Sequence, residues 1–115
     1  MADVEVRLTI DNTELVKRAT EQAVLVGLEA VGLRAEGYAK MKCPVDTGNL
    51  RNSITHAVDA PSKSAIIGTN VEYAAYVEKG TSRQKAQPYL EPAATNHTPE
   101  YKRIFEEQLE RLSDI

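Results

Sequence analysis

The feature that most constrains the fold is a proline-free segment from about Thr13 to Met41, which has the periodicity of one long amphipathic helix. Asp11 or Asn12 can cap its first turn. Its apolar side chains form two stripes, the first of Val16, Ala19, Ala23, Val26, Ala30 and Leu33 and the second of Val24, Leu28, Val31, Ala35 and Tyr38. A helix that is apolar over more than half of its circumference must be covered on two sides. A chain this short has little material for both covers, so a neighbouring subunit is a reasonable second cover.

Gly27 and Gly32 lie within this helix. Each weakens an isolated helix by roughly 1 kcal/mol. Either they permit close backbone approach, or they are merely tolerated. The sequence leaves both interpretations open.

Shorter patterns predict the remaining elements. Alternating apolar and polar residues are typical of a half-buried strand, Pro44 ends the helix, and Thr98-Pro99 has the form of an N-cap followed by proline at the first helical position. The predicted elements are a strand over about 4–10, the long helix over about 13–41, a turn over 44–52, a hairpin over about 53–69, a loop over 79–87 and a C-terminal helical segment over about 88–112. The predicted apolar face of the last helix consists of Tyr101, Ile104, Phe105, Gln108 and Leu112, with only Gln108 out of place. We therefore predict one α+β domain over residues 1–115, in which the long N-terminal helix packs on a small, mainly antiparallel β-sheet.

Charge and composition limit the possible partners. A formal net charge of −3 and an aromatic content of 5% argue against a dedicated nucleic-acid-binding protein. Lys79, Arg83 and Lys85 do cluster in the predicted loop; a solvated, mobile loop is the favoured interpretation and a phosphate contact the other. The apolar window over 23–33 is too short to span a bilayer, and the N-terminus lacks the pattern of a signal peptide, so we expect a soluble protein.

The chain also lacks the common signatures of a bound metal or cofactor. A single cysteine cannot form an intrachain disulfide, and no metal-ligand spacing joins Cys43 to His56 or His97. Neither a P-loop nor a dinucleotide fingerprint is present. We expect no cofactor, no metal and a reducing cytoplasm as the place of synthesis.

The tripeptide Asp46-Thr47-Gly48 raises the alternative of a dimeric, retropepsin-like aspartic protease. Such an enzyme holds its paired carboxylates on loops of a nearly all-β barrel. Here a long predicted helix leads directly to the tripeptide, and another helix closes the chain. We favour a structural interpretation, in which Asp46 or Thr47 starts a turn or one-turn helix and Leu50 packs inward, and we expect the protein not to be an enzyme.

Three segments in a fixed order carry a family resemblance: CPVDTGNLRNSI, IGTNVEYAAYVEKGT and KAQPYLEPA. Together with the long helix before them, they resemble the HK97 gp10-like family of phage proteins, over roughly Val16 to Leu112. The matching residues of the first segment are Pro44, Asp46, Thr47, Gly48, Leu50 and Arg51; those of the later two are Tyr73, Ala74, Tyr76, Val77, Glu78, Gly80, Thr81, Pro88, Tyr89, Leu90, Pro92 and Ala93. Lys79 and Ala75 depart from the family pattern, which has an apolar aromatic and a proline there.

The resemblance implies a structural virion protein of a tailed bacteriophage or prophage, a tail-completion or neck protein at the head-tail junction. It implies a ring of subunits around a channel through which double-stranded DNA passes. A hexamer is one possible size of that ring. Its partners would be itself, the head-completion or connector proteins, and the tail-terminator or tail-tube proteins, with no membrane. A small regulatory or adaptor binding module is the alternative class.

Interface residues follow from the same resemblance. The segment Val24 to Tyr38 is the candidate for the core plus one lateral flank. The expected interface residues are Tyr73, Tyr76, Glu78, Gly80, Thr81, Arg83, Lys85, Pro88, Tyr89 and Leu90. Tyrosines bury area and keep a polar tip, which suits interfaces. That these tyrosines simply seal the core of the subunit is an equally good alternative.

Overall fold

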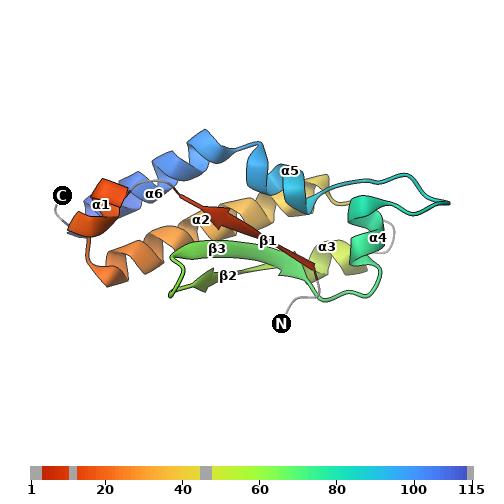
Figure 1. Ribbon diagram of the computed structural model, residues 1–115, viewed down its shortest axis with the longest axis horizontal. Coiled ribbons are helices and arrows are strands. Elements are labelled where there is room, and N and C mark those ends of the chain that lie inside the picture. Colours follow the sequence, from red (N-terminus) through yellow and green to blue (C-terminus); the bar gives the residue numbers. More distant parts are fainter. Residues whose placement is uncertain (1–3, 11–12, 45–47, 114–115) are drawn as a thin grey trace.

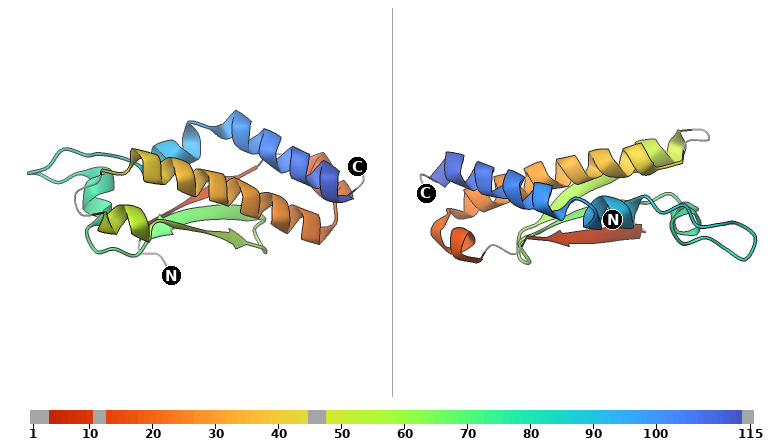
Figure 2. Two further views of the ribbon diagram at one scale, coloured as in Figure 1. Left: turned by 180° about the vertical axis from the view of Figure 1, so that it is seen from behind. Right: turned by 90° about the horizontal axis from the view of Figure 1, so that it is seen from above.

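The computed structural model describes residues 4–10, 13–44 and 48–113. Its elements are β1 (Val4–Thr9), α1 (Thr13–Arg18), α2 (Glu21–Lys42), α3 (Asn49–Ser53), β2 (Thr55–Asp59), β3 (Ser64–Thr69), α4 (Ala74–Lys79), α5 (Leu90–Thr95) and α6 (Thr98–Ser113). The strands form one antiparallel sheet in the order β1-β3-β2, and the helices α2 and α6 run side by side over one of its faces (Figure 1 and Figure 2). The predicted α+β fold, a long helix on a small antiparallel sheet with a C-terminal helix, is confirmed.

The sheet has one apolar face and one polar face, as the alternation in β1 predicts. Val6 and His56 both stand opposite Ile67 across the central strand, and Leu8 stands opposite Ala65. Directly opposed residues share a face, and Leu8, Ala65 and Ile67 are almost completely buried. This is the face that α2 covers.

The other face of the sheet carries a polar cluster. The guanidinium of Arg7 donates hydrogen bonds to Asp59 and Ser62 at 2.8 Å and to Ser64 at 2.5 Å. Arg7 covers Ser64, whose side chain is buried although it lies on the outer face. This network satisfies the polar groups beside the β2-β3 turn.

The predicted helix over 13–41 is two helices, so the prediction of one continuous helix was wrong at its N-terminal end. Thr20 has extended backbone angles, φ −72° and ψ 155°, and its hydroxyl oxygen accepts a hydrogen bond from the backbone N–H of Ala23 at 3.1 Å. Thr20 is therefore an N-cap inside the apolar pattern, which continues across the break and conceals it.

Two glycines of α2, Gly27 and Gly32, lie where other elements approach the helix. A Cβ at Gly27 would stand 2.9 Å from side-chain carbons of both Phe105 and Leu109 in α6, and one at Gly32 would stand 3.0 Å from the His56 ring in β2. These two glycines therefore permit close approach rather than being merely tolerated, but what approaches them is the side chains of α6 and β2 and not another backbone. They mark the two sides on which α2 is covered by its own subunit.

Helix α6 buries a slightly different face from the predicted one. Tyr101, Phe105 and Leu109 are buried, whereas Leu112 is 51% exposed. The four-residue spacing of these buried residues brings Phe105 and Leu109 together against Gly27. Leu112 was therefore wrongly assigned to the buried face, and Leu109 was missed.

The molecule is elongated, with principal extents of 52, 25 and 21 Å. The loop between α4 and α5 projects from one end, beside α3 and α4, while α1 and the C-terminal end of α6 lie at the opposite end (Figure 1). Among the described residues, no helix is long and apolar enough to cross a membrane.

Candidate functional site

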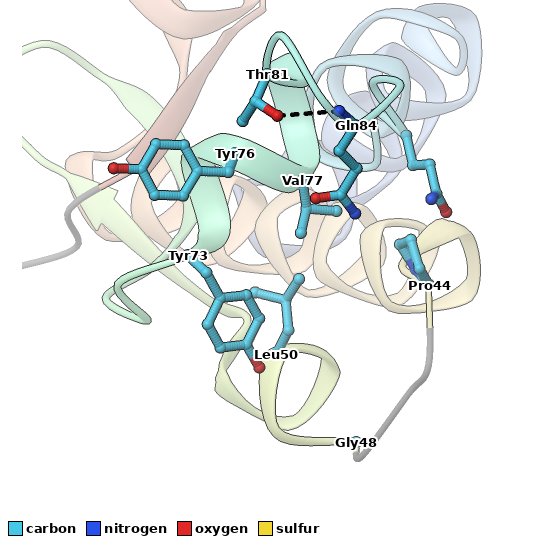
Figure 3. A pocket seen from close by; sticks show the side chains of 9 residues that line it. Pro44, Gly48, Leu50, Tyr73, Tyr76, Val77, Thr81 and Gln84 are labelled. Atoms are coloured by element: carbon cyan, nitrogen blue, oxygen red, sulfur yellow. Dashed lines mark hydrogen bonds between the residues drawn. The ribbon is translucent and has the colours of Figure 1, made fainter.

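A cavity of about 390 Å³ lies at the end of the molecule from which the loop projects. It is lined by Pro44, Gly48, Leu50, Tyr73, Tyr76, Val77, Thr81, Gln84 and Gln87. In Figure 3, Leu50 and Tyr73 lie together on one side, and Val77, Gln84 and Pro44 complete the wall. Residues from all three segments of the sequence motif thus meet around one cavity, since Gln87 belongs to the third segment. We call it the motif cavity.

Helix α3 forms the floor of the motif cavity through a tight turn. Gly48 has a φ of +84°, a left-handed conformation that favours glycine, and its carbonyl accepts from the N–H of Asn52 at 2.9 Å. Leu50 is buried, and the Ser53 hydroxyl shares a 2.5 Å hydrogen bond with Thr69 at the end of β3. The predicted one-turn helix with Leu50 packing inward is confirmed. Asp46 and Thr47 lie outside the described residues.

The loop 80–88, which we call the basic loop, forms another wall. Gly80 has a φ of +78°, and a Cβ there would lie 2.7 Å from the backbone nitrogen of Ala86. Only glycine fits this position without strain. The Thr81 hydroxyl oxygen accepts from the N–H of Gln84 at 3.0 Å, and the N–H of Gln87 donates to the Val77 carbonyl at 2.8 Å. These bonds fold the loop back toward α4.

Glu78 holds the second and third segments of the motif together. Its Oε1 accepts hydrogen bonds from the N–H groups of Tyr89 at 3.0 Å and Leu90 at 2.9 Å, and its Oε2 accepts from Glu91 at 3.1 Å. The first N–H groups of a helix have no partner within it, and no side chain of α5 caps its start. The buried carboxylate of Glu78 supplies that cap from α4.

The expected interface tyrosines divide into two groups. Tyr89 is completely buried, and its hydroxyl donates to the Ala74 carbonyl at 3.3 Å; burial raises the pKa of this phenol far above its ordinary value. Leu90 is also completely buried. Tyr73 and Tyr76 are 40% and 60% exposed at the motif cavity. Within the subunit, Tyr89 therefore seals the core, whereas Tyr73 and Tyr76 are free to contact a partner.

The surroundings of the motif cavity are positively charged. Five exposed cations lie within two positions of a residue that lines it: Lys42, Arg51, Lys79, Arg83 and Lys85. None of them forms an ion pair with any residue that the structure describes. Two described acidic residues also lie within two positions of a lining residue. Glu72 is exposed, and the carboxylate of Glu78 faces α5. Pro88, exposed, closes the loop before α5.

Reactive groups near the cavity are few. Burial raises the pKa of the Cys43 thiol, an effect that the nearby charge of Arg51 only partly offsets, so the thiolate needed for nucleophilic chemistry is disfavoured. The described residues contain no cluster of three or more His, Cys, Asp or Glu side chains with the geometry of a metal site.

A second surface lies along α2, on the side away from the sheet. Ala30, Leu33, Gly37 and Met41 follow one another at helical spacing, and Leu33 and Met41 are 59% and 76% exposed. We call these four residues the α2 stripe. Together with Arg34, Tyr38 and Ile104 they line an apolar groove of about 450 Å³ between α2 and α6.

Gly37 distinguishes the α2 stripe from the rest of the helix. A Cβ at this position would meet nothing within 4 Å, so neither packing nor backbone conformation within the subunit requires a glycine. The first apolar stripe predicted from the sequence ends at Leu33. Extending the same spacing by two steps would have found Gly37 and Met41. In the motif cavity, Gln87 lies within the third motif segment, whereas no sequence signal points to Gln84.

An ion-pair cluster ties the edge strand β2 to α2. The ring nitrogens of His56 lie 2.7 Å from the Glu36 carboxylate and 2.5 Å from that of Glu29, and Lys40 lies 3.1 Å from Glu36. Both nitrogens can donate only when the imidazole is protonated. Burial alone would lower the pKa of His56, but the hydrogen bonds to Glu36 and Glu29 outweigh it and raise that pKa above its ordinary value.

The comparison with known families supports the resemblance over the first part of the chain. Residues 9–80 match the family model described as "Bacteriophage HK97-gp10, putative tail-component". The match covers more than half of the chain, and the protein belongs to this family of phage tail components. The third segment, around Tyr89 and Leu90, lies beyond the matched residues. Neither the search of curated proteins nor the search of solved structures returns a match.

Proposed function

We propose that this tail component acts at the head-tail junction, as one subunit of a ring around the DNA channel. Assembly takes place in the host cytoplasm, and the protein remains in the virion. Its partners are further copies of itself, the head-completion or connector proteins, and the tail-terminator or tail-tube proteins, with double-stranded DNA only as passing cargo. The net charge of −3 suits such a conduit, because like charge discourages the duplex from binding.

The observation that carries this proposal is the α2 stripe. Helix α2 is covered by the sheet and by α6, yet it keeps a third apolar side with two largely exposed side chains and a glycine that the subunit does not need. Contiguous exposed apolar surface marks contact sites in proteins. A ring subunit needs lateral flanks for its neighbours, and the α2 stripe has the composition of such a flank.

The motif cavity supplies a second contact surface at an end of the molecule. Its lining residues lie in or beside α3, α4 and the basic loop, which stand at one end of the elongated molecule (Figure 1), whereas the residues of the α2 stripe all belong to the long helix α2. A junction protein has to contact neighbours within its own ring and proteins above or below that ring. Two separate surfaces, one lateral and one terminal, fit this division.

We also propose that the protein is not an enzyme. The observed α+β fold differs from the nearly all-β barrel on which paired aspartates act in retropepsin-like proteases. The test is a peptidase assay of the wild type and of Asp46→Asn, including high protein concentration to favour dimers. Activity that disappears in the variant would restore the protease alternative.

The junction role is tested by deleting this gene alone from the phage or prophage and examining the lysate by electron microscopy. DNA-filled heads beside unattached tails, cured by supplying the protein, are the expected result. Joined particles of normal appearance would contradict the junction role and favour the adaptor-module alternative.

A loop variant tests the terminal surface in the same assay. Deleting Ser82–Ala86 removes the projecting part of the basic loop but leaves the Gln87 bond to Val77, so the subunit is expected to fold and yet fail to join heads to tails. A control of equal length, in which the same five residues are replaced by glycine and serine, separates loop length from side-chain chemistry. If the variant that lacks Ser82–Ala86 still joined heads to tails, the loop would have no role in docking.

A further inference from the structure

We infer that the motif cavity binds an acidic peptide segment of a partner protein, with one apolar side chain inserted among the tyrosines. The inference rests on the proposed function and deepens it by stating the chemistry of the partner. It comes from three independent observations: the shape and lining of the cavity, its free hydrogen-bonding groups, and the charges around it.

The lining suits the anchoring side chain of a peptide. A volume of about 390 Å³ lies within the ~300–1,000 Å³ that is usual for binding pockets. Leu50 and Val77 provide an apolar base, and the rings of Tyr73 and Tyr76 are partly exposed above it. Partly exposed aromatic rings around a small apolar depression are typical of the few residues that dominate a protein interface.

Polar groups stand ready around the same cavity. The side-chain amides of Gln84 and Gln87 line it, and no hydrogen bond of either amide to another described residue is found, although the backbone N–H groups of both residues are bonded. Each amide offers a donor and an acceptor, the combination that an extended peptide backbone requires. A phosphate or a DNA backbone offers only hydrogen-bond acceptors and no apolar side chain. It would therefore contact the cations around the cavity but leave the apolar interior unfilled.

The surrounding charge selects the sign of the partner. The basic loop and Lys79 together carry three positive charges and no negative one, although the whole chain has a net charge of −3. Arg83 and Lys85 flank the lining residue Gln84, and Arg51 follows the lining residue Leu50. Because these cations form no ion pair with described residues, an incoming carboxylate gains their attraction without breaking an existing contact.

The direct test is the binding of three labelled peptides to the isolated protein, measured by fluorescence anisotropy and by amide chemical shifts. The first is Gly-Glu-Glu-Ala-Phe-Ala-Glu-Glu-Gly; the second has lysine for each glutamate, and the third has alanine for phenylalanine. The first peptide is expected to bind and to shift the amides of Tyr73, Tyr76, Thr81 and Gln84. Both altered peptides are expected to bind at least about tenfold more weakly.

Variants of the protein test the same contacts from the other side. Arg83→Glu with Lys85→Glu, and separately Tyr76→Ala, are expected to weaken binding of the first peptide at least about tenfold. The matched control is Lys17→Glu with Lys102→Glu, which reverses two exposed cations on α1 and α6 and is expected to leave binding unchanged. Equal binding of the lysine peptide, or binding that survives both cavity variants, overturns the inference.

Other occupants give different results in the same experiment. A DNA duplex that displaces the acidic peptide, and binds as well to Tyr76→Ala as to the wild type, identifies a phosphate site instead. Amide shifts at Tyr73 and Tyr76 that grow with protein concentration alone identify a second copy of the chain as occupant. Either outcome overturns the inference.

The failure of this inference is distinguishable from the failure of the proposed function. Peptide binding is measured on the isolated protein, whereas the junction role is measured by head-tail joining after gene deletion. If the gene deletion abolishes joining but the isolated protein binds none of the peptides, only the inference is rejected. Peptide binding in a protein whose deletion leaves joined particles rejects only the junction role.

Discussion

The Oε1 atom of Glu78 lies 2.9 Å from the backbone nitrogen of Leu90, across the base of the basic loop. With the bonds to Tyr89 and Glu91, this contact fixes the start of α5 relative to the end of α4. Glu78 was expected at an interface with partner proteins. Within the subunit it is the cap of a helix that is distant in sequence, which gives the glutamate of the motif a structural role.

Replacing Glu78 therefore tests the stability of the fold. Glu78→Ala leaves three N–H groups without their acceptor and is expected to lower the free energy of unfolding by roughly 3 kcal/mol or more. Glu78→Gln keeps one acceptor oxygen and is expected to cost about 1–2 kcal/mol. Urea denaturation measures both.

The exposed Glu72 provides the control for Glu78. Glu72→Ala is expected to change the free energy of unfolding by less than about 0.5 kcal/mol. Equal losses in Glu72→Ala and Glu78→Ala would show that the cap contributes nothing of its own.

Two glycines of α2 give opposite predictions for the same substitution. Gly27→Ala places a Cβ 2.9 Å from side-chain carbons of Phe105 and Leu109, and the overpacking is expected to lower the free energy of unfolding by about 1–3 kcal/mol. The Cβ of Gly37→Ala meets nothing within 4 Å, and this substitution is expected to raise the free energy of unfolding by about 0.5–1 kcal/mol through helix propensity. Thermal or urea denaturation of the two variants decides the comparison, and a destabilised Gly37→Ala would contradict it.

His56 makes stability depend on pH in a defined direction. Its pKa is raised in the folded protein, so its contribution is fully present below the unfolded pKa, about 6.5, and is lost as the pH rises through the folded pKa. The pKa of Glu36 is lowered: burial alone would raise it, but the hydrogen bonds to His56 and Lys40 outweigh that effect. The contribution of Glu36 is therefore lost only in acid, as the pH falls below about 4.5.

The free energy of unfolding is thus expected to fall in the wild type as the pH rises above about 6.5. The variant His56→Gln is expected to lose this part of the pH dependence, and His97→Gln serves as the control because it leaves the two carboxylates and His56 in place. Urea denaturation at several pH values measures the slope. A slope that is the same in wild type and His56→Gln would show that the cluster does not titrate in this range.

The sequence predicted those elements whose pattern is local. The alternation of Val6 and Leu8 identifies the buried face of β1, and Gly48 with Leu50 identifies the turn that becomes α3. The break at Thr20 was missed because a single cap residue is weaker evidence than an apolar pattern that continues through it. Boundaries of this kind are set by one hydrogen bond.

The parts that the sequence could not predict depend on contacts between distant segments. The bonds from Glu78 to α5 and from His56 to Glu29 and Glu36 exist only after the helices and strands have packed. Likewise, Leu109 rather than Leu112 is buried because of where α6 crosses α2 at Gly27. The motif cavity combines residues from three separate stretches, so all of its lining residues except Gln84 lie in the motif segments, but its shape depends on how those segments pack.

The last prediction concerns self-association through the α2 stripe. Leu33→Asp with Met41→Asp introduces two carboxylates at positions that are 59% and 76% exposed, so the subunit is expected to fold, with a free energy of unfolding lowered by no more than about 1–2 kcal/mol through helix propensity and the helix dipole. Burying those charges against a neighbour is unfavourable, so ring formation is expected to be lost. Leu112→Asp is the matched control, since Leu112 is 51% exposed but lies on α6 outside the stripe. Sedimentation velocity and electron microscopy of assembled rings distinguish the variants; rings that form normally with Asp at both α2 positions would exclude the α2 stripe as the lateral flank.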